Sequence, residues 1–251
     1  KLPHLIPGLY LYDMILKIQR KAAVDISDKN LKEYIYKFLY WIKFSEDLLN
    51  KCKPDIVILS HSISYQCTPL AWIAAKRKIP TIILGGDFGI PRLWKIIKPN
   101  DIFLGTGRPT KKDFKNIPLK KKSSLIFTGK KYIINRISGN SSDISAKYAY
   151  QGKQDKISKL GIDPKKYKKV ISIYVACFFD FPHGYGMKRF TDMLDWLQLT
   201  IEKASLKKDI LWLLKPHPME KWYGGDKLSD FVKKQLPENL ILLNDNYSGK
   251  D

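Results

Sequence analysis

The sequence lacks several features that would assign it to a class at once. Its three cysteines, Cys52, Cys67 and Cys177, lie far apart and form no CxxC pair, which excludes a disulfide scaffold and the usual zinc-site spacing. No apolar run approaches the length of about eighteen residues that a membrane span needs, and the N-terminus shows no signal-peptide pattern. From these absences we expect a cytoplasmic protein.

Motifs of common enzyme classes are also missing. The sequence has no GxGxxG fingerprint and no GxSxG nucleophile elbow, so neither a dinucleotide site of the usual type nor a Ser-His-Asp hydrolase is expected. No DxD motif follows a predicted strand. We predict no cofactor.

Acidic residues are scarce relative to basic ones. The chain has 45 Lys and Arg residues against 24 Asp and Glu residues, which gives a net charge of +21. Such an excess concentrates anions near the surface and speeds their capture. The excess is mostly lysine, as in KKK at 120–122 and KKYKK at 165–169, and no nucleic-acid-binding motif accompanies it. Anionic lipid, nucleotide sugars and acidic polysaccharide would all fit this charge, so the charge alone names no partner, and without such a motif no nucleic-acid partner is predicted.

The sequence does contain an alternation of helices and apolar strands. Residues 10–24 and 28–52 repeat apolar side chains at three- and four-residue steps, which predicts helices. Short apolar runs at 54–60 and 80–86 predict parallel strands that are buried on both faces. A helix predicted at 66–78 joins these strands into a βαβ unit.

The middle of the chain is less regular, and the alternation then resumes. GDFGIPR (86–92) and GTGRPTKKD (105–113) predict loops because of their glycines and proline. Residues 122–137 predict a helix, and 144–168 predict a helix followed by a lysine-rich linker. The later elements are strands at 169–176, 209–215 and 239–244 and helices at 187–206 and 226–236.

Two such series predict an α/β protein with two Rossmann-like domains, whose parallel sheets face each other across a cleft. The predicted domains are residues 1–165 and residues 166–251. The second series stops at its third strand, and three parallel strands leave one edge and one face poorly covered. We therefore expect that parts of both domains are missing from the sequence, most clearly the C-terminal half of the second.

Three of the four histidines follow predicted strands. His61 comes directly after the first strand, His183 follows the strand at 169–176, and His217 follows the strand at 209–215. Ligands of open α/β sheets bind beyond the carboxyl ends of the strands. The three imidazoles are therefore predicted to converge on the cleft.

The loop KPHP (215–218) is the first candidate for a binding site. Pro216 and Pro218 fix φ on both sides of His217, and Lys215 ends the preceding strand. A lysine beside a rigidly held imidazole suits a phosphate or diphosphate oxygen. A strand exit with a solvated histidine is the alternative that the residues leave open.

The loop CFFDFPHGYGM (177–187) is the second candidate. Gly184 and Gly186 precede a predicted helix and allow close backbone approach, so the N–H groups beside His183 could bind an anion. Asp180 adds a carboxylate to the same loop. Its aromatic side chains fit a hydrophobic core and a sugar-stacking surface equally well.

The third candidate combines SHSISYQ (60–66) with GGDFG (85–89). Asp87, flanked by glycines at a strand end, could act as a general base toward a sugar hydroxyl, and His61 lies at the neighbouring strand end. A turn or a helix cap explains Asp87 equally well.

Further along, WYGGD (222–226) follows the KPHP loop. Trp222 could pack its ring on a nucleobase or a pyranose. Asp226 is expected to cap the next helix, which is a structural role.

Several of these runs resemble a known family. FFDFPHGYGMKRFTDMLDWLQLTIEKA and WLLKPHPMEKWYGG resemble bacterial capsule polysaccharide biosynthesis proteins, the Kdo-transferase-like group of GT-B glycosyltransferases that carry a His-Pro motif. SHSISYQCTPLAWIAAKRKIPTIILGGDFG is similar to the N-terminal domain of the same group. The resemblance covers most of residues 54–225.

The resemblance implies a GT-B fold and a metal-independent glycosyltransferase with a nucleotide-sugar donor, of which a CMP-linked donor is favoured. It assigns His217 to the donor phosphate, with Lys215 and Pro218 shaping the loop. We place His183, Gly184 and Trp222 on the donor side as well.

The resemblance also implies that residues 1–165 hold mainly the acceptor and residues 166–251 mainly the nucleotide donor. The implied acceptor is a polysaccharide or a lipid-linked glycan. Asp87, His61 and Asp180 are the candidates that assist its hydroxyl group. Peripheral contact with the inner membrane face is left open. Family members continue with a strand and a Gly-, Ser- and Thr-rich loop that this sequence does not contain.

Two other functions are kept as alternatives. A CDP-glycerol-dependent glycerophosphotransferase shares the His-Pro loop. A basic, non-catalytic module that binds an anionic glycan or nucleic acid would show steeply salt-dependent binding without preference for a nucleotide donor.

Overall fold

The computed structural model describes residues 2–87, 90–102, 111–141, 144–150, 157–232, 236–244 and 247, and for a few residues within elements, Asp87 among them, it describes the backbone alone. The chain divides into two compact units, each of which is described by itself. The first unit comprises residues 1–107 and 178–197, and the second comprises 108–177 and 198–251. The domain boundary predicted after residue 165 falls inside the second unit and remains a prediction.

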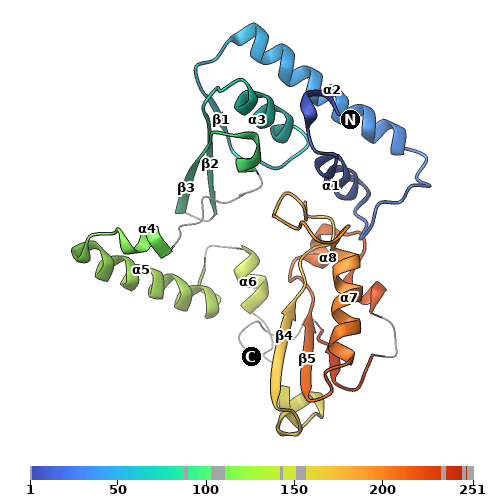
Figure 1. The fold of residues 1–251 in the computed structure, drawn as a ribbon. Coiled ribbons are helices and arrows are strands. Elements are labelled where there is room, and N and C mark those ends of the chain that lie inside the picture. The colour runs from blue at the N-terminus through green and yellow to red at the C-terminus, as the bar shows by residue number, and fades with distance from the viewer. Residues whose placement is uncertain are drawn as a thin grey trace. The chain divides into compact units, whose positions relative to one another are not determined.

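The first unit combines three helices with a three-stranded sheet (Figure 1). The helices are α1 (Gly8–Gln19), α2 (Leu31–Cys52) and α3 (Cys67–Lys76). The strands are β1 (Val57–Leu59), β2 (Thr81–Asp87) and β3 (Ile90–Ile96). Helix α7 (Met193–Ser205) begins in this unit and continues into the second. The predicted βαβ unit is confirmed, since β1 and β2 pair in parallel across α3.

Strand β3 corrects the sequence-based prediction. Residues 86–92 were expected to form a loop, whereas Ile90–Ile96 pairs antiparallel with β2, from Asp87 opposite Ile90 to Thr81 opposite Ile96. The proline in this segment is tolerated because β3 is the edge strand in the order β1-β2-β3, where a missing N–H costs no ladder hydrogen bond.

The helices of the first unit cover one face of its sheet. Phe38 of α2, Ile73 of α3 and Ile83 of β2 belong to one core, together with Met14 of α1. On the opposite face Ile58, Leu84 and Leu93 are exposed, because the side chains of a strand alternate between its two faces. The prediction that the strand at 54–60 is buried on both faces is therefore wrong for the described part of the chain.

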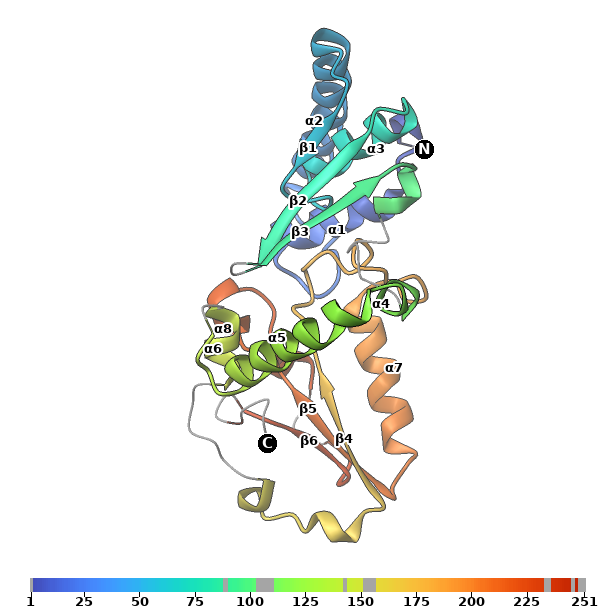
Figure 2. The same ribbon diagram turned by 90° about the vertical axis from the view of Figure 1, so that its left-hand side faces the viewer.

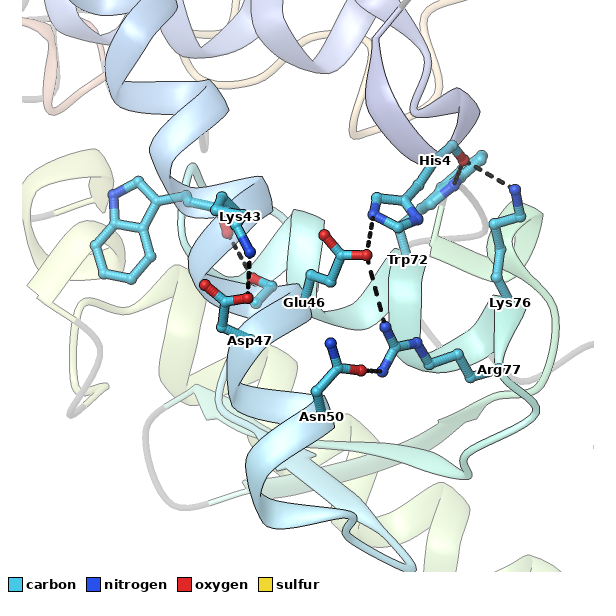
Figure 3. A network of polar contacts seen from close by, with 10 residues as sticks. His4, Lys43, Glu46, Asp47, Asn50, Trp72, Lys76 and Arg77 are labelled. Atoms are coloured by element: carbon cyan, nitrogen blue, oxygen red, sulfur yellow. Dashed lines mark hydrogen bonds and ion pairs between the residues drawn. The ribbon is translucent and has the colours of Figure 1, made fainter.

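A polar network ties the N-terminal turn to α2 and α3 (Figure 3). Glu46 Oε1 lies 3.5 Å from His4 Nε2 and 3.9 Å from Arg77 Nη2. Arg77 Nη1 donates to Asn50 Oδ1 at 2.8 Å, and Trp72 Nε1 donates to the His4 carbonyl at 3.2 Å. These contacts give His4, the one histidine that does not follow a strand, a role in packing.

The second unit contains a sheet of three parallel strands (Figure 2). The strands, in the order β4-β5-β6, are β4 (Lys169–Tyr174), β5 (Ile210–Lys215) and β6 (Leu240–Leu242). All three were predicted. The helices are α4 (Lys111–Lys115), α5 (Leu119–Ile137), α6 (Ile144–Tyr150), α8 (Glu220–Tyr223) and α9 (Leu228–Phe231).

Three local predictions in this unit need correction. The loop expected at 105–113 contains the start of α4 in its described part. The helix expected at 226–236 is a single turn, α9, and residues 233–235 lie outside the described residues. Its N-cap is Lys227 rather than Asp226, because Asp230 within the turn accepts a hydrogen bond from the Lys227 N–H and sets the start one residue later.

Both units therefore have a mixed α/β architecture with parallel strand pairs, consistent with Rossmann-like domains. Among the described residues no helix is both long and apolar enough to cross a membrane.

Candidate functional site

In the first unit, the loop at 178–187 closes on a buried carboxylate of α1. Asp13 is fully buried, and its Oδ1 lies 2.7 Å from His183 Nδ1. The Gly184 N–H donates to Asp13 Oδ2 at 2.8 Å, and the His183 N–H donates to Oδ1 at 3.3 Å. The N–H groups that the sequence assigned to an external anion thus bind an anion of the chain itself. A donor contact by His183 or Gly184 stays a prediction.

The His183 ring is held on its other sides too. The Phe190 carbonyl accepts a hydrogen bond from the ring, and the Tyr12 ring meets it edge-on at 5.7 Å between centroids. Burial alone would lower the pKa of His183. The hydrogen bond and the charge of Asp13 oppose this effect, and the Phe190 carbonyl and the charge of Asp192 add to them. Together they outweigh the effect of burial, so the pKa of His183 is raised. The contact with Asp13 therefore favours the protonated, cationic form of the His183 ring.

Tyr12 extends this cluster to the end of the loop. Its hydroxyl donates to Asp192 Oδ2 at 2.8 Å. Burial and this hydrogen bond raise the pKa of Tyr12 to about 12, so the phenol stays neutral at physiological pH. Two residues of one turn of α1, Tyr12 and Asp13, thus fix the loop through a neutral and a charged contact.

Asp180, a predicted catalytic carboxylate, lies at the exposed edge of the same loop. Its Oδ1 is 2.7 Å from Lys17 Nζ, and both side chains are partly exposed. Lys17 Nζ also lies 5.5 Å from the centroid of Phe179 and 5.6 Å from that of Phe181. This lysine therefore orients the Asp180 carboxylate.

The strand exits of the first unit adjoin the loop. A Cβ atom at Gly184 would lie 2.5 Å from Ile63 Cγ2, so the loop packs directly on the segment that follows β1. His61 in that segment is exposed, with Nδ1 3.1 Å from Ser60 Oγ. Asp87 ends β2 opposite Ile90 of β3, four residues beyond Ile83, where the pairing of β2 with β1 ends. The Asp87 side chain lies outside the described residues.

In the second unit, the KPHP loop leaves the carboxyl end of β5. Lys215 is buried, and its ammonium donates to the Tyr247 carbonyl. His217 is half-buried, and its Nδ1 accepts a hydrogen bond from the Met219 N–H at 3.1 Å. This contact places the proton of the neutral ring on Nε2.

Next to this loop lies a pocket of about 440 Å³ at the carboxyl ends of β5 and β6. Its volume is within the usual range for small-molecule sites, and its position is the one where open α/β sheets bind ligands. The lining residues are Pro216, Glu220, Lys221, Lys227, Ser229, Leu242, Leu243 and Asn244.

Two further predicted residues lie at the end of the KPHP loop and beyond it. Pro218, which follows His217, is half-buried. Trp222 is exposed and its ring centroid lies 5.1 Å from that of Tyr148 of α6. A stacking role for Trp222 stays a prediction.

Sequence reasoning missed two groups of residues. Asp13 lies among apolar residues in GLYLYDMILKIQ, and a carboxylate on the buried face of a helix is rare enough to have marked it. Lys221 and Lys227 line the pocket from the segment after KPHP, and no local pattern distinguishes them from the other lysines of a basic chain.

Among the residues that the structure describes, no group of three or more His, Cys, Asp or Glu side chains could hold a metal ion. The prediction of a site without a metal or cofactor stays a prediction.

Comparisons with known proteins give one partial similarity. No protein-family model matches the chain, and no solved structure matches it. Over 69 residues the chain is 41% identical to the UDP-N-acetylglucosamine--N-acetylmuramyl-(pentapeptide) pyrophosphoryl-undecaprenol N-acetylglucosamine transferase of Halalkalibacterium halodurans. The matched segment spans 28% of this chain and 17% of that transferase. The chain is thus similar, over part of its length, to a glycosyltransferase.

Proposed function

We propose that this chain is part of a glycosyltransferase that moves a sugar from a nucleotide-activated donor onto a capsular or other surface glycan. The observation that carries the proposal is the pocket at the carboxyl ends of β5 and β6, beside the His217 loop and lined by Lys221 and Lys227. The partial similarity to a glycosyltransferase supports the same reaction class.

In this proposal the pocket binds the phosphate-bearing part of the donor. Lys221 and Lys227 supply positive charge, and Ser229 and Asn244 supply polar atoms for the nucleoside or the sugar. His217 Nε2–H donates to a phosphate oxygen at the mouth, where negative charge grows as the sugar leaves. Lys215 anchors the start of the loop, because its ammonium donates a hydrogen bond to the Tyr247 carbonyl.

The acceptor hydroxyl needs a base, and the proposal assigns this role to the first unit. His61 and Asp180 are accessible enough to exchange a proton with a substrate. Asp87 is the third candidate, from its place at the end of β2.

Two donor classes compete within the proposal. The His-Pro resemblance favours a CMP-linked sugar, whereas the transferase that matches over 69 residues is named for a UDP-linked sugar. A thermal-shift and calorimetric titration of the chain with CMP, CDP, UMP and UDP decides between them, because ligand that binds only the folded state raises the melting temperature.

The matched variants are His217→Ala and Lys221→Ala, with Lys208→Ala as the control. Lys208 lines a different pocket, beside Tyr167 and Glu238. We expect about a tenfold loss of nucleotide affinity in the first two variants, the size of a lost charge-assisted hydrogen bond, and no change in the control. Failure of all four nucleotides to bind, with salt-dependent binding of an anionic glycan instead, would favour the non-catalytic module. Turnover of CDP-glycerol would favour the glycerophosphotransferase.

A further inference from the structure

Helix α5 (Leu119–Ile137) presents an apolar stripe to solvent. Leu119, Ile126 and Ile133 recur at seven-residue steps, and Phe127 and Ile134 follow beside them, so all five lie on one face of the helix. Phe127 is 70% exposed and Ile134 is 65% exposed. No residue of α5 is buried. The stripe is therefore not covered by the part of the chain that the structure describes.

The same helix is strongly basic. It contains Lys120, Lys121, Lys122, Lys130, Lys131 and Arg136 and no acidic residue. Residues 111–141, which include α4, carry nine basic residues against the single acid Asp113, a net charge of +8. At helical spacing Lys120 and Lys131 fall along the edge of the stripe next to Phe127.

Helix α4 is held against α5 and adds to the same surface. Lys122 Nζ donates to the Lys115 carbonyl at 3.0 Å and lies 5.6 Å from the centroid of the Phe114 ring. Phe114 is itself exposed. The two helices are neighbours in the fold (Figure 2), and together they form one basic and apolar surface, which we call the α4–α5 surface.

We infer that the α4–α5 surface binds an anionic lipid bilayer, with α5 lying in the plane of the interface. The apolar stripe would enter the boundary between head groups and acyl chains, while the lysines at its edge contact lipid phosphates. Lys130, within the stripe, can extend its ammonium to the head groups while its methylenes stay buried. This inference goes beyond the proposed function and does not rest on it.

Other occupants fit the surface less well. A nucleic acid would satisfy the lysines but would leave Phe127 and Ile134 exposed to water, because contacts to phosphates bury little apolar area. A second copy of the chain would bring two lysine-rich helices together, at a cost in like-charge repulsion. A bilayer with anionic lipids satisfies both the charge and the apolar stripe.

The test is co-sedimentation of the chain with vesicles of phosphatidylcholine alone and of phosphatidylcholine mixed with phosphatidylglycerol. We expect at least about tenfold stronger binding to the anionic vesicles, because each basic residue near such a surface contributes about fivefold. We also expect binding to weaken as salt is added.

Two pairs of double variants separate the contribution of the apolar stripe to vesicle binding from that of the lysines. The double variant Phe127→Ser and Ile134→Ser should lower vesicle binding about tenfold or more. The control is the double variant Ile26→Ser and Leu206→Ser, which changes residues outside the α4–α5 surface that are 83% and 68% exposed. The control should not lower vesicle binding. Lys120→Glu with Lys131→Glu should lower it about as much. The control Lys29→Glu with Lys51→Glu changes the net charge equally and should have little effect.

Three results would overturn the inference. The first is equal loss of binding in test and control variants, which would indicate an unspecific charge effect. The second is equal binding to neutral and anionic vesicles. The third is a Phe127-dependent dimer in analytical ultracentrifugation, or Phe127-dependent binding of nucleic acid, without vesicle binding. Far-ultraviolet circular dichroism of each variant shows that the fold is retained.

Discussion

Asp13 and His183 are separated by 170 residues in sequence, yet their side chains meet at 2.7 Å with almost no exposure to solvent. A buried carboxylate is costly unless it is paired and hydrogen-bonded. Here the imidazolium and two backbone N–H groups together satisfy it. The pair therefore determines where the loop at 178–187 lies on the first unit.

Removing the charge of Asp13 should destabilise the chain strongly. In Asp13→Asn the buried imidazolium loses its counterion, so we expect a loss of about 3–5 kcal/mol in the free energy of unfolding, measured by urea denaturation. The control Asp180→Asn breaks the partly exposed pair with Lys17 and should cost about 1 kcal/mol or less. Equal losses in the two variants would contradict this account.

The same pair makes stability depend on pH. The pKa of His183 is raised in the folded chain, so the unfolded chain loses this proton first as pH rises. The stabilisation is complete below the ordinary histidine pKa of about 6.5 and is lost as pH rises through the higher, folded-state pKa. Tyr12, with a pKa of about 12, does not titrate in this window.

The measurement compares wild type with His183→Gln. The difference in their free energies of unfolding should be largest in mildly acidic solution and should shrink as pH rises past the folded-state pKa of His183. A difference that grows with pH would refute the assignment of His183 as a buried cation.

Gly184 is predicted to be required for a steric reason. A methyl group at this position would meet Ile63 Cγ2 at 2.5 Å, so Gly184→Ala should cost about 1–3 kcal/mol, the usual penalty of overpacking. The second change Ile63→Ala should recover part of this loss in a double-mutant cycle. Gly129→Ala, in the interior of α5 with open space around it, should instead be neutral or stabilising.

Asn239 should be essential for the packing of the second unit. Its buried amide donates to the carbonyls of Ala204, Lys207 and Ile210 at 2.9–3.2 Å, which ties the end of α7 to the start of β5. Asn239→Asp would place a carboxylate, which cannot donate a hydrogen bond, against three carbonyl oxygens. We therefore expect a loss of about 3 kcal/mol or more in the free energy of unfolding. Thermal unfolding followed by circular dichroism measures this, with the exposed Asn30→Asp as the control.

Every described strand except β3 could be predicted, because the signals of these strands are local. Apolar runs such as those that contain β1, β2 and β5 indicate buried strands whatever their neighbours are. The hairpin strand β3 could not be predicted in this way, since Gly86 and Pro91 indicate a loop unless the pairing between β2 and β3 is known. The length of α9 was likewise misjudged, because tertiary contacts decide where a weak helix ends.

The candidate site was predictable only in part. The position of His217 beyond β5 follows from the strand pattern, and the pocket next to it agrees with that reasoning. The pairing of His183 with Asp13 depends on a contact across 170 residues, which no local pattern contains. For the same reason the sequence assigned the N–H groups of the loop to an external anion.

The order of the segments in the first unit has a consequence for its synthesis on the ribosome. Residues 178–197 complete a unit that otherwise ends at residue 107, so the seventy residues 108–177 must be translated in between. At bacterial and eukaryotic elongation rates this takes roughly 4–14 s. Throughout that interval the nascent chain contains α1 but not His183, the partner of the Asp13 carboxylate. We therefore expect the unfinished first unit to depend on chaperones most during this delay.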